Sequence, residues 1–85
     1  MKIPVEITQY LPQKGLQLNW VDGFIIDTNI ENGAIIIRAN REGLISLAQH
    51  LLTLAQIEVE SGNHIHFDDN NSLEEGASEL IIEKI

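Results

Sequence analysis

The sequence predicts a single α+β domain over residues 1–85: an antiparallel β-sheet of about five to six strands with one long helix packed on one face. Three observations predict this fold. Apolar and polar residues alternate in short runs on both sides of the middle of the chain, as they do in half-buried strands. Asn32-Gly33 marks a tight hairpin turn. The one long stretch with helical periodicity, residues 41–57, lies between these runs, so the order is strands, helix and then two strands.

Length and composition indicate an ordinary globular domain. The chain has 85 residues, of which 44% are hydrophobic and 21% are charged, and a chain of this size buries about 60–65% of its unfolded surface. It contains no cysteine, which excludes disulfides and thiolate chemistry. No apolar run is long enough to span a bilayer, and the first residues do not build the apolar stretch of a signal peptide. We therefore expect a cytoplasmic protein.

The first strands are expected where apolar residues occupy every second position. Residues 3–7 show this alternation, and Pro4 favours a position at the edge of the sheet. Residues 16–20 repeat the pattern. A tight turn at Asp22-Gly23 then leads into a third strand that begins at residue 24.

The hairpin around Asn32-Gly33 has one register that satisfies both of its faces. Centring the turn on these two residues places Asp27 opposite Arg38, a pair of opposite charges, on one face. The other face then becomes apolar, as a sheet surface covered by a helix requires. The residues of that face are Ile26, Thr28, Ile30, Ile35, Ile37 and Ala39.

A helix is expected from about Arg41 to Ile57. Asn40 can cap its first turn, and Glu42 lies where the positive end of the helix dipole favours an acid. Apolar residues fill one broad arc, which we expect to lie on the sheet: Leu44, Leu47, Ala48, Leu51, Leu52, Leu54 and Ala55. The opposite arc, which we expect to face solvent or a partner, holds Ser46, Gln49, His50, Thr53 and Gln56.

The last third of the chain carries two further strands and nearly all of the net charge. Residues 64–68 alternate with Ile65 and Phe67 inward, residues 69–77 form an acidic loop, and residues 78–85 form the closing strand. Residues 58–85 contain eight acids and one lysine, and the net charge of the whole chain is −8. This balance argues against nucleic acid or an anionic membrane as the partner and favours a cationic protein.

Four acids around that loop are the predicted partner-binding groups. We expect Asp68, Asp69, Glu74 and Glu75 to speed association with a cationic partner, because clustered charge raises association rates. The alternative is that these acids only keep a small protein soluble.

Catalytic or metal chemistry has few candidates. His64, His66 and Asp68 fall on one side of a strand, because successive side chains alternate, and they could share a zinc ion. Histidines that lie beside acids on a strand surface more often bind no metal. No nucleophile stands beside a base with an orienting acid, and no glycine loop of the phosphate-binding type occurs. We therefore expect no enzymatic activity and no cofactor.

Part of the sequence resembles a known family. The stretch from Asn40 to Ala55, the segment from Gly62 to Asp68, and the segments 73–76 and 79–85 resemble the immunity protein 32 family of bacterial polymorphic toxin systems. The resemblance covers residues 40–85. It implies an α+β fold and neutralisation of a cognate protein toxin by tight, non-catalytic binding, and it supplies no mapped contact residues. A toxin that is a nuclease would be cationic.

Two other classes of function stay open beside this resemblance. One is a small homo-oligomeric protein with a structural or regulatory role. The other is a metal-binding module built on the His64-x-His66 pattern.

A further expectation concerns the sheet face that the helix leaves uncovered. If the turn at Asp22-Gly23 has two residues, Trp20 lies beside Ile25 on this face, and Leu18 and Ile36 complete an apolar patch. Such a patch would bind the toxin or a second subunit of a homodimer, with Trp20 as its anchor. A longer turn or a bulge would instead direct Leu18 and Trp20 into the core.

Overall fold

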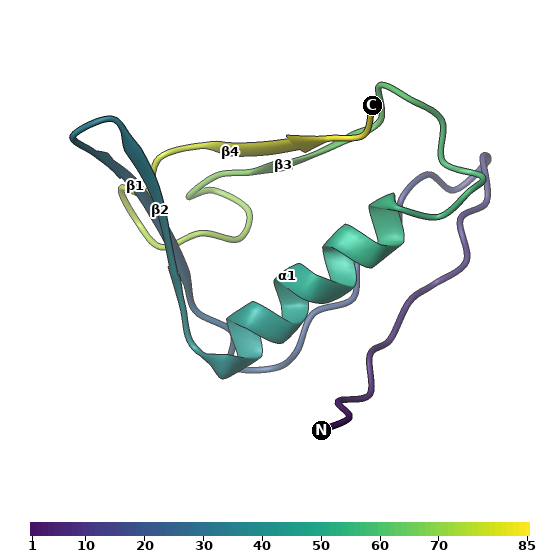
Figure 1. Cartoon of the computed structure of the whole chain (residues 1–85), viewed down its shortest axis with the longest axis horizontal. Coiled ribbons are helices and arrows are strands. Elements are labelled where there is room, and N and C mark those ends of the chain that lie inside the picture. Colours follow the sequence, from purple (N-terminus) through teal and green to yellow (C-terminus); the bar gives the residue numbers. More distant parts are fainter.

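The structure is a computed structural model that describes residues 1–85 and contains one helix and four strands. β1 pairs with β2, and β3 pairs with β4, in two separate antiparallel sheets of two strands each. Figure 1 shows the helix α1 leaving the foot of the β1–β2 hairpin and running beneath the β3–β4 pair. The elements are β1 (Ile26–Glu31), β2 (Ala34–Ala39), α1 (Arg41–Leu54), β3 (His64–Phe67) and β4 (Leu80–Glu83).

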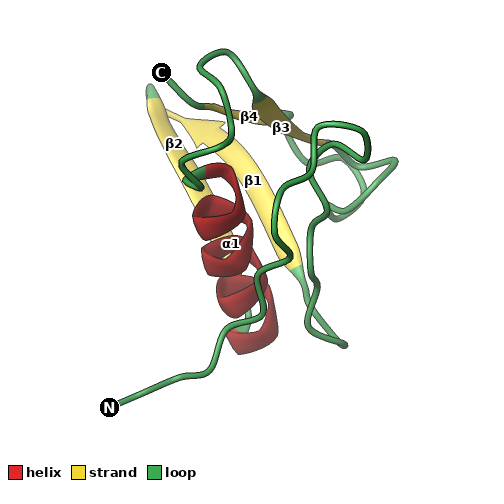
Figure 2. Cartoon of the chain, turned by 90° about the vertical axis from the view of Figure 1, so that its right-hand side faces the viewer, coloured by secondary structure: helices red, strands yellow, loops and turns green.

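The prediction of one sheet with five to six strands is wrong, although the α+β class holds. Residues 1–25 contain no strand, apart from a single bridge between Leu11 and Gly15. They form an extended segment that runs beside α1 (Figure 2). The closing strand is also shorter than the predicted 78–85, because β4 spans only Leu80–Glu83.

The N-terminal segment does not join a sheet because its backbone is bonded to side chains of α1 and of Gln56, just after the helix. Gln49 Oε1 accepts a hydrogen bond from the N–H of Glu6 at 2.8 Å. Gln56 Oε1 accepts one from the N–H of Tyr10 at 2.9 Å, and Gln56 Nε2 donates to the carbonyl of Thr8 at 3.1 Å. Backbone groups that a neighbouring strand would satisfy are therefore satisfied by amide side chains.

The predicted hairpin register is confirmed. Asp27 lies opposite Arg38 and Ile30 opposite Ile35, on either side of a two-residue turn. Both turn residues have positive φ, 50° at Asn32 and 80° at Gly33, which is the twist that two-residue hairpins favour. Asp27 and Arg38 do not approach within the 4.0 Å of an ion pair.

The apolar face of this hairpin is buried only at its foot. Ile26 and Thr28 are buried beneath the rest of the molecule. Ile30, Ile35 and Ile37, toward the tip, are 64%, 72% and 43% exposed. The prediction that the helix covers the whole face is therefore wrong.

The start of α1 is as predicted, and the helix ends at Leu54 rather than Ile57. Asn40 Oδ1 accepts hydrogen bonds from the N–H groups of Gly43 at 2.8 Å and of Ile25 at 2.9 Å. Its Nδ2 also donates to the carbonyl of Gly23 at 2.9 Å. One capping side chain thus fixes both the helix and the chain that enters β1.

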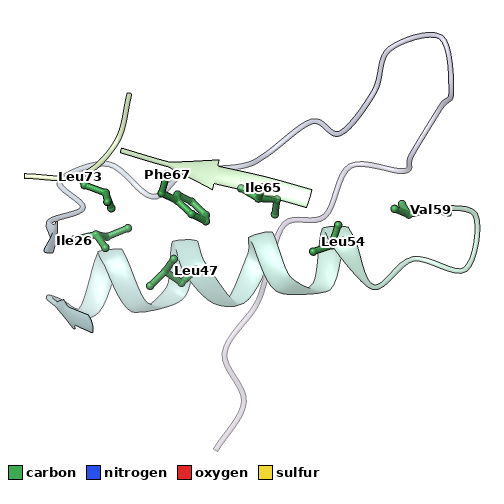
Figure 3. Packing of buried hydrophobic residues seen from close by; sticks show 7 residues of the cluster. All are labelled: Ile26, Leu47, Leu54, Val59, Ile65, Phe67 and Leu73. Atoms are coloured by element: carbon green, nitrogen blue, oxygen red, sulfur yellow. The ribbon is translucent and has the colours of Figure 1, made fainter. Parts of the chain in front are cut away.

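The hydrophobic core lies between α1 and β3 (Figure 3). Ile65 and Phe67 point inward from β3, as predicted, and are 5% and 1% exposed. Val59 and Leu73 close the two ends of the cluster from the connecting loops. The complete cluster is Ile26, Leu47, Leu54, Val59, Ile65, Phe67 and Leu73.

The predicted orientation of α1 is only partly right. Leu47 and Leu54 of the apolar arc are buried in the core, as predicted. Leu44, Leu51 and Leu52, which were expected on the sheet, are 55%, 47% and 48% exposed. The polar arc is buried instead, and its members Ser46, Gln49, His50 and Thr53 are at most 4% exposed. The N-terminal segment covers this arc because the polar side chains bind its backbone. The helix is therefore rotated relative to the predicted orientation, and of its leucines only Leu47 and Leu54 reach the core.

Candidate functional site

The acidic loop after β3 is the first candidate site. Asp68 begins it, and Asp68 Oδ1 accepts hydrogen bonds from the N–H groups of Asn70 and Asn71 at 2.9 and 3.0 Å. Asp69 Oδ2 accepts one from the N–H of Gly76 at 3.1 Å. These two acids therefore hold the loop in shape, as Asp side chains do in turns.

Glu74 and Glu75 have no such role, and both are exposed. The loop that carries them is fastened to the open edge of β1. The N–H of Glu74 donates to the carbonyl of Ile26 at 2.9 Å, and the N–H of Ser78 donates to the carbonyl of Thr28 at 2.9 Å. The four predicted acids thus share one loop, but only the carboxylates of Glu74 and Glu75 accept no hydrogen bond within it.

The outer face of β3 and β4 is the second candidate site. His66 Nε2 lies 3.6 Å from Glu79 Oε2 and 3.9 Å from Asp68 Oδ2. One ligand atom from each of these three residues lies within 4.8 Å of the others, which is compatible with a shared cation. His64 belongs to no such group, so the third group beside His66 and Asp68 is Glu79.

Sequence reasoning missed Glu79 because the register of β3 with β4 was unknown. Phe67 lies opposite Leu80, which brings the next residues, Asp68 and Glu79, to the same end of the pair. His66 supplies the only nitrogen ligand, and Glu79 is exposed. Metal binding at this face stays a prediction.

The predicted apolar patch is divided between two places. Trp20 packs inward, with its ring 4.5 Å from that of Phe24 and 4.2 Å from that of His50, and it remains 36% exposed. Leu18 packs against the core. Ile36 instead lies on the outer face of the hairpin, since Ile35 and Ile37 share the inner face with Ile26. Their role in partner binding stays a prediction.

His50 is a buried titratable group whose environment the sequence did not indicate. Its side chain is fully buried, and its Nε2 lies 3.1 Å from the carbonyl of Asn19. Nδ1 is buried without a partner. Burial lowers the pKa of His50, and the hydrogen bond to Asn19 opposes this shift. The neutral ring with the proton on Nε2 fits this site, because a proton on Nδ1 would have no acceptor.

The surface has no pocket, and α1 is neither long nor apolar enough to cross a membrane. Fold and surface together define a small acidic α+β protein with an accessible acidic loop.

Residues 34–85 match the family model of Immunity protein 32, and the chain belongs to this family. The match includes β2, α1, β3, β4 and the acidic loop, and it confirms the family predicted from residues 40–85. Comparisons with curated proteins and with solved structures gave no match.

Proposed function

We propose that this protein neutralises a cognate bacterial toxin by non-catalytic binding, and that the acidic loop attracts a cationic surface of that toxin. Membership of the immunity protein family is the observation that carries the first half of the proposal. The distribution of charge supports the second half, because residues 58–85 hold eight of the thirteen acids.

The proposed attraction is electrostatic and acts before close contact. A toxin that cleaves nucleic acid needs a cationic surface for its polyanionic substrate, and an acidic inhibitor can compete for that surface. The carboxylates of Glu74 and Glu75 are exposed at the loop and accept none of its hydrogen bonds, so they can approach a partner without unfolding the chain. A toxin of another class with a cationic surface would be attracted in the same way.

The neutralisation is tested by co-expression with a toxin domain, which is to be sought first in the genes next to this one. Growth should be restored when the chain is present, and purified chain and toxin should form a stable complex. Failure of both rescue and complex formation would overturn the proposed function.

The role of the loop is tested by a matched pair of double variants. Glu74→Gln with Glu75→Gln should slow association several-fold and reduce its dependence on salt. Glu58→Gln with Glu60→Gln changes the net charge equally in the connection between α1 and β3, away from the loop, and serves as the control. Equal slowing by both pairs would show that net charge matters and the loop does not.

A further inference from the structure

The outer edge of β2 is an unpaired strand edge. The two edges of the hairpin differ, because the edge of β1 is bonded to the segment 74–78, whereas no backbone hydrogen bond outside the hairpin involves residues 34–39. The sequence of β2, Ala-Ile-Ile-Ile-Arg-Ala, contains neither proline nor an inward-pointing charge that would protect such an edge. Figure 2 shows β2 as the outer strand of the hairpin.

The register identifies which backbone groups are free on that edge. In a two-residue hairpin the residues that flank the turn, Glu31 and Ala34, form a hydrogen-bonded pair, and such pairs recur at every second position. The bond from Asn40 N–H to the carbonyl of Ile25 continues this series at the foot of the hairpin. The N–H and C=O groups of Ile35 and Ile37 therefore point away from β1.

We infer that β2 pairs antiparallel with β2 of a second copy of this chain and forms a homodimer with a continuous four-stranded sheet. The register that uses the free groups of both copies places Ile35 opposite Ile37 of the other copy and Ile36 opposite its own counterpart. Each of the two Ile35–Ile37 pairs exchanges two backbone hydrogen bonds, about four in total. Ile30, Ile35 and the other copy's Ile37 then form one apolar row across the inner face.

Charge complementarity supports a second copy as the occupant and supports this register. Arg38 is exposed and has no ion pair within its own chain. In the dimer, Arg38 of one copy lies opposite Ala34 of the other copy. Within that other copy, Ala34 lies opposite Glu31 of the same hairpin. Because alanine leaves the space between them open, the guanidinium of Arg38 reaches toward Glu31 of the other copy. The two-fold axis repeats this contact.

The first measurement is the mass in solution across a concentration series. Light scattering should give twice the 9.5 kDa of the chain in the micromolar range, about 1–100 μM. Ile37→Pro should shift the mass toward the monomer, because it removes an N–H that points out of the hairpin and leaves the β1–β2 bonds in place. Circular dichroism must show that this variant remains folded.

The charge pair gives a second test that does not depend on proline. Arg38→Glu and Glu31→Arg should each weaken the dimer about tenfold, because two symmetric contacts change from attraction to repulsion. The double variant should restore it. Lys14→Glu, which makes the same charge change as Arg38→Glu at an exposed turn, is the control and should leave the dimer intact.

Three results would overturn the pairing. A chain that stays monomeric up to about 0.1 mM has no such dimer. A dimer unaffected by Ile37→Pro and by either charge reversal uses another surface. A monomer that binds toxin only while the β2 edge is intact would assign that edge to the toxin, and this outcome would leave the proposed neutralisation standing.

Discussion

Two parts of the α1 surface lie in environments opposite to those that their side chains ordinarily occupy. The face with Ser46, Gln49 and His50 is buried under the N-terminal segment, whereas the face with Leu44 and Leu51 is open. Apart from His50 Nδ1, the buried side-chain polar atoms of this face have hydrogen-bond partners. Gln49, for example, bonds to the chain at Glu6 and at Asn19. The difference shows that hydrogen-bonding partners, and not apolar character alone, decide which side of a helix a small domain covers.

The largest expected effect separates two leucines of the same helix. Leu54 is 4% exposed and belongs to the core, whereas Leu52 is 48% exposed on the open face. Leu54→Ala should lower the free energy of unfolding by about 2–5 kcal/mol. Leu52→Ala should change it by about 0.5 kcal/mol or less. Denaturant unfolding of both variants makes the comparison, and equal losses would contradict the observed orientation of α1.

Replacing Gly43 by alanine should destabilise the protein, whereas the same replacement in an exposed helix stabilises the helix. Replacing an exposed helical glycine by alanine normally stabilises a helix by about 1 kcal/mol. Here a Cβ at position 43 would lie 2.5 Å from the carbonyl oxygen of Ile25. Gly43→Ala should therefore destabilise the protein by about 1–3 kcal/mol in thermal or denaturant unfolding. A stabilised variant would show that α1 does not approach the foot of β1 so closely.

Because the polar face of α1 is buried, removing one of its amide side chains should lower the free energy of unfolding. The pattern of leucines alone would not predict this loss. Gln49→Ala should cost about 1–2 kcal/mol of unfolding free energy, because it leaves the N–H of Glu6 and the carbonyl of Asn19 without this partner. Gln17→Ala is the control, since Gln17 is exposed. If the two variants are equally stable, the N-terminal segment is not held by the helix.

His50 predicts a pH dependence that belongs to the buried face alone. Burial lowers its pKa in the folded protein, so the unfolded chain binds the proton more readily. The stabilisation is fully present above the unfolded pKa of about 6.5 and is lost as pH falls through that value toward the lower folded pKa. His50→Gln should reduce this loss, measured as the unfolding midpoint between about pH 7 and 5.

The exposed His64 provides the matched control for that measurement. His64→Gln should keep the pH dependence of the original chain. A pH dependence that survives His50→Gln unchanged would assign the titration to another group.

The features that local chemistry determines could be predicted from the sequence. The Asn32-Gly33 turn and the alternating residues on either side of it were sufficient to predict the full β1–β2 register. Asn40 was sufficient to predict the start of α1. Ile65 and Phe67 were identified as core because strand alternation leaves only one inward side. The family was also predictable, from the helix and the C-terminal segments.

The remaining features depend on long-range contacts that no periodicity records. Residues 3–7 and 16–20 alternate like strands, and an extended segment held by distant side chains has the same pattern. The acceptors for its backbone, Gln49 and Gln56, lie more than 40 residues away. The position of Glu79 beside His66 likewise follows from the β3–β4 register, which no turn signal fixes.

Amide hydrogen exchange tests most directly whether the polar face of α1, together with Gln56 just after the helix, holds the N-terminal segment. The N–H of Val21 donates to Ser46 Oγ at 2.9 Å, and the N–H of Tyr10 donates to Gln56 Oε1 at 2.9 Å. We predict that both amides exchange more slowly than that of Gln17, and that Ser46→Ala removes the protection at Val21 but not at Tyr10. Exchange at Val21 and Tyr10 as fast as at Gln17 would contradict the buried polar face.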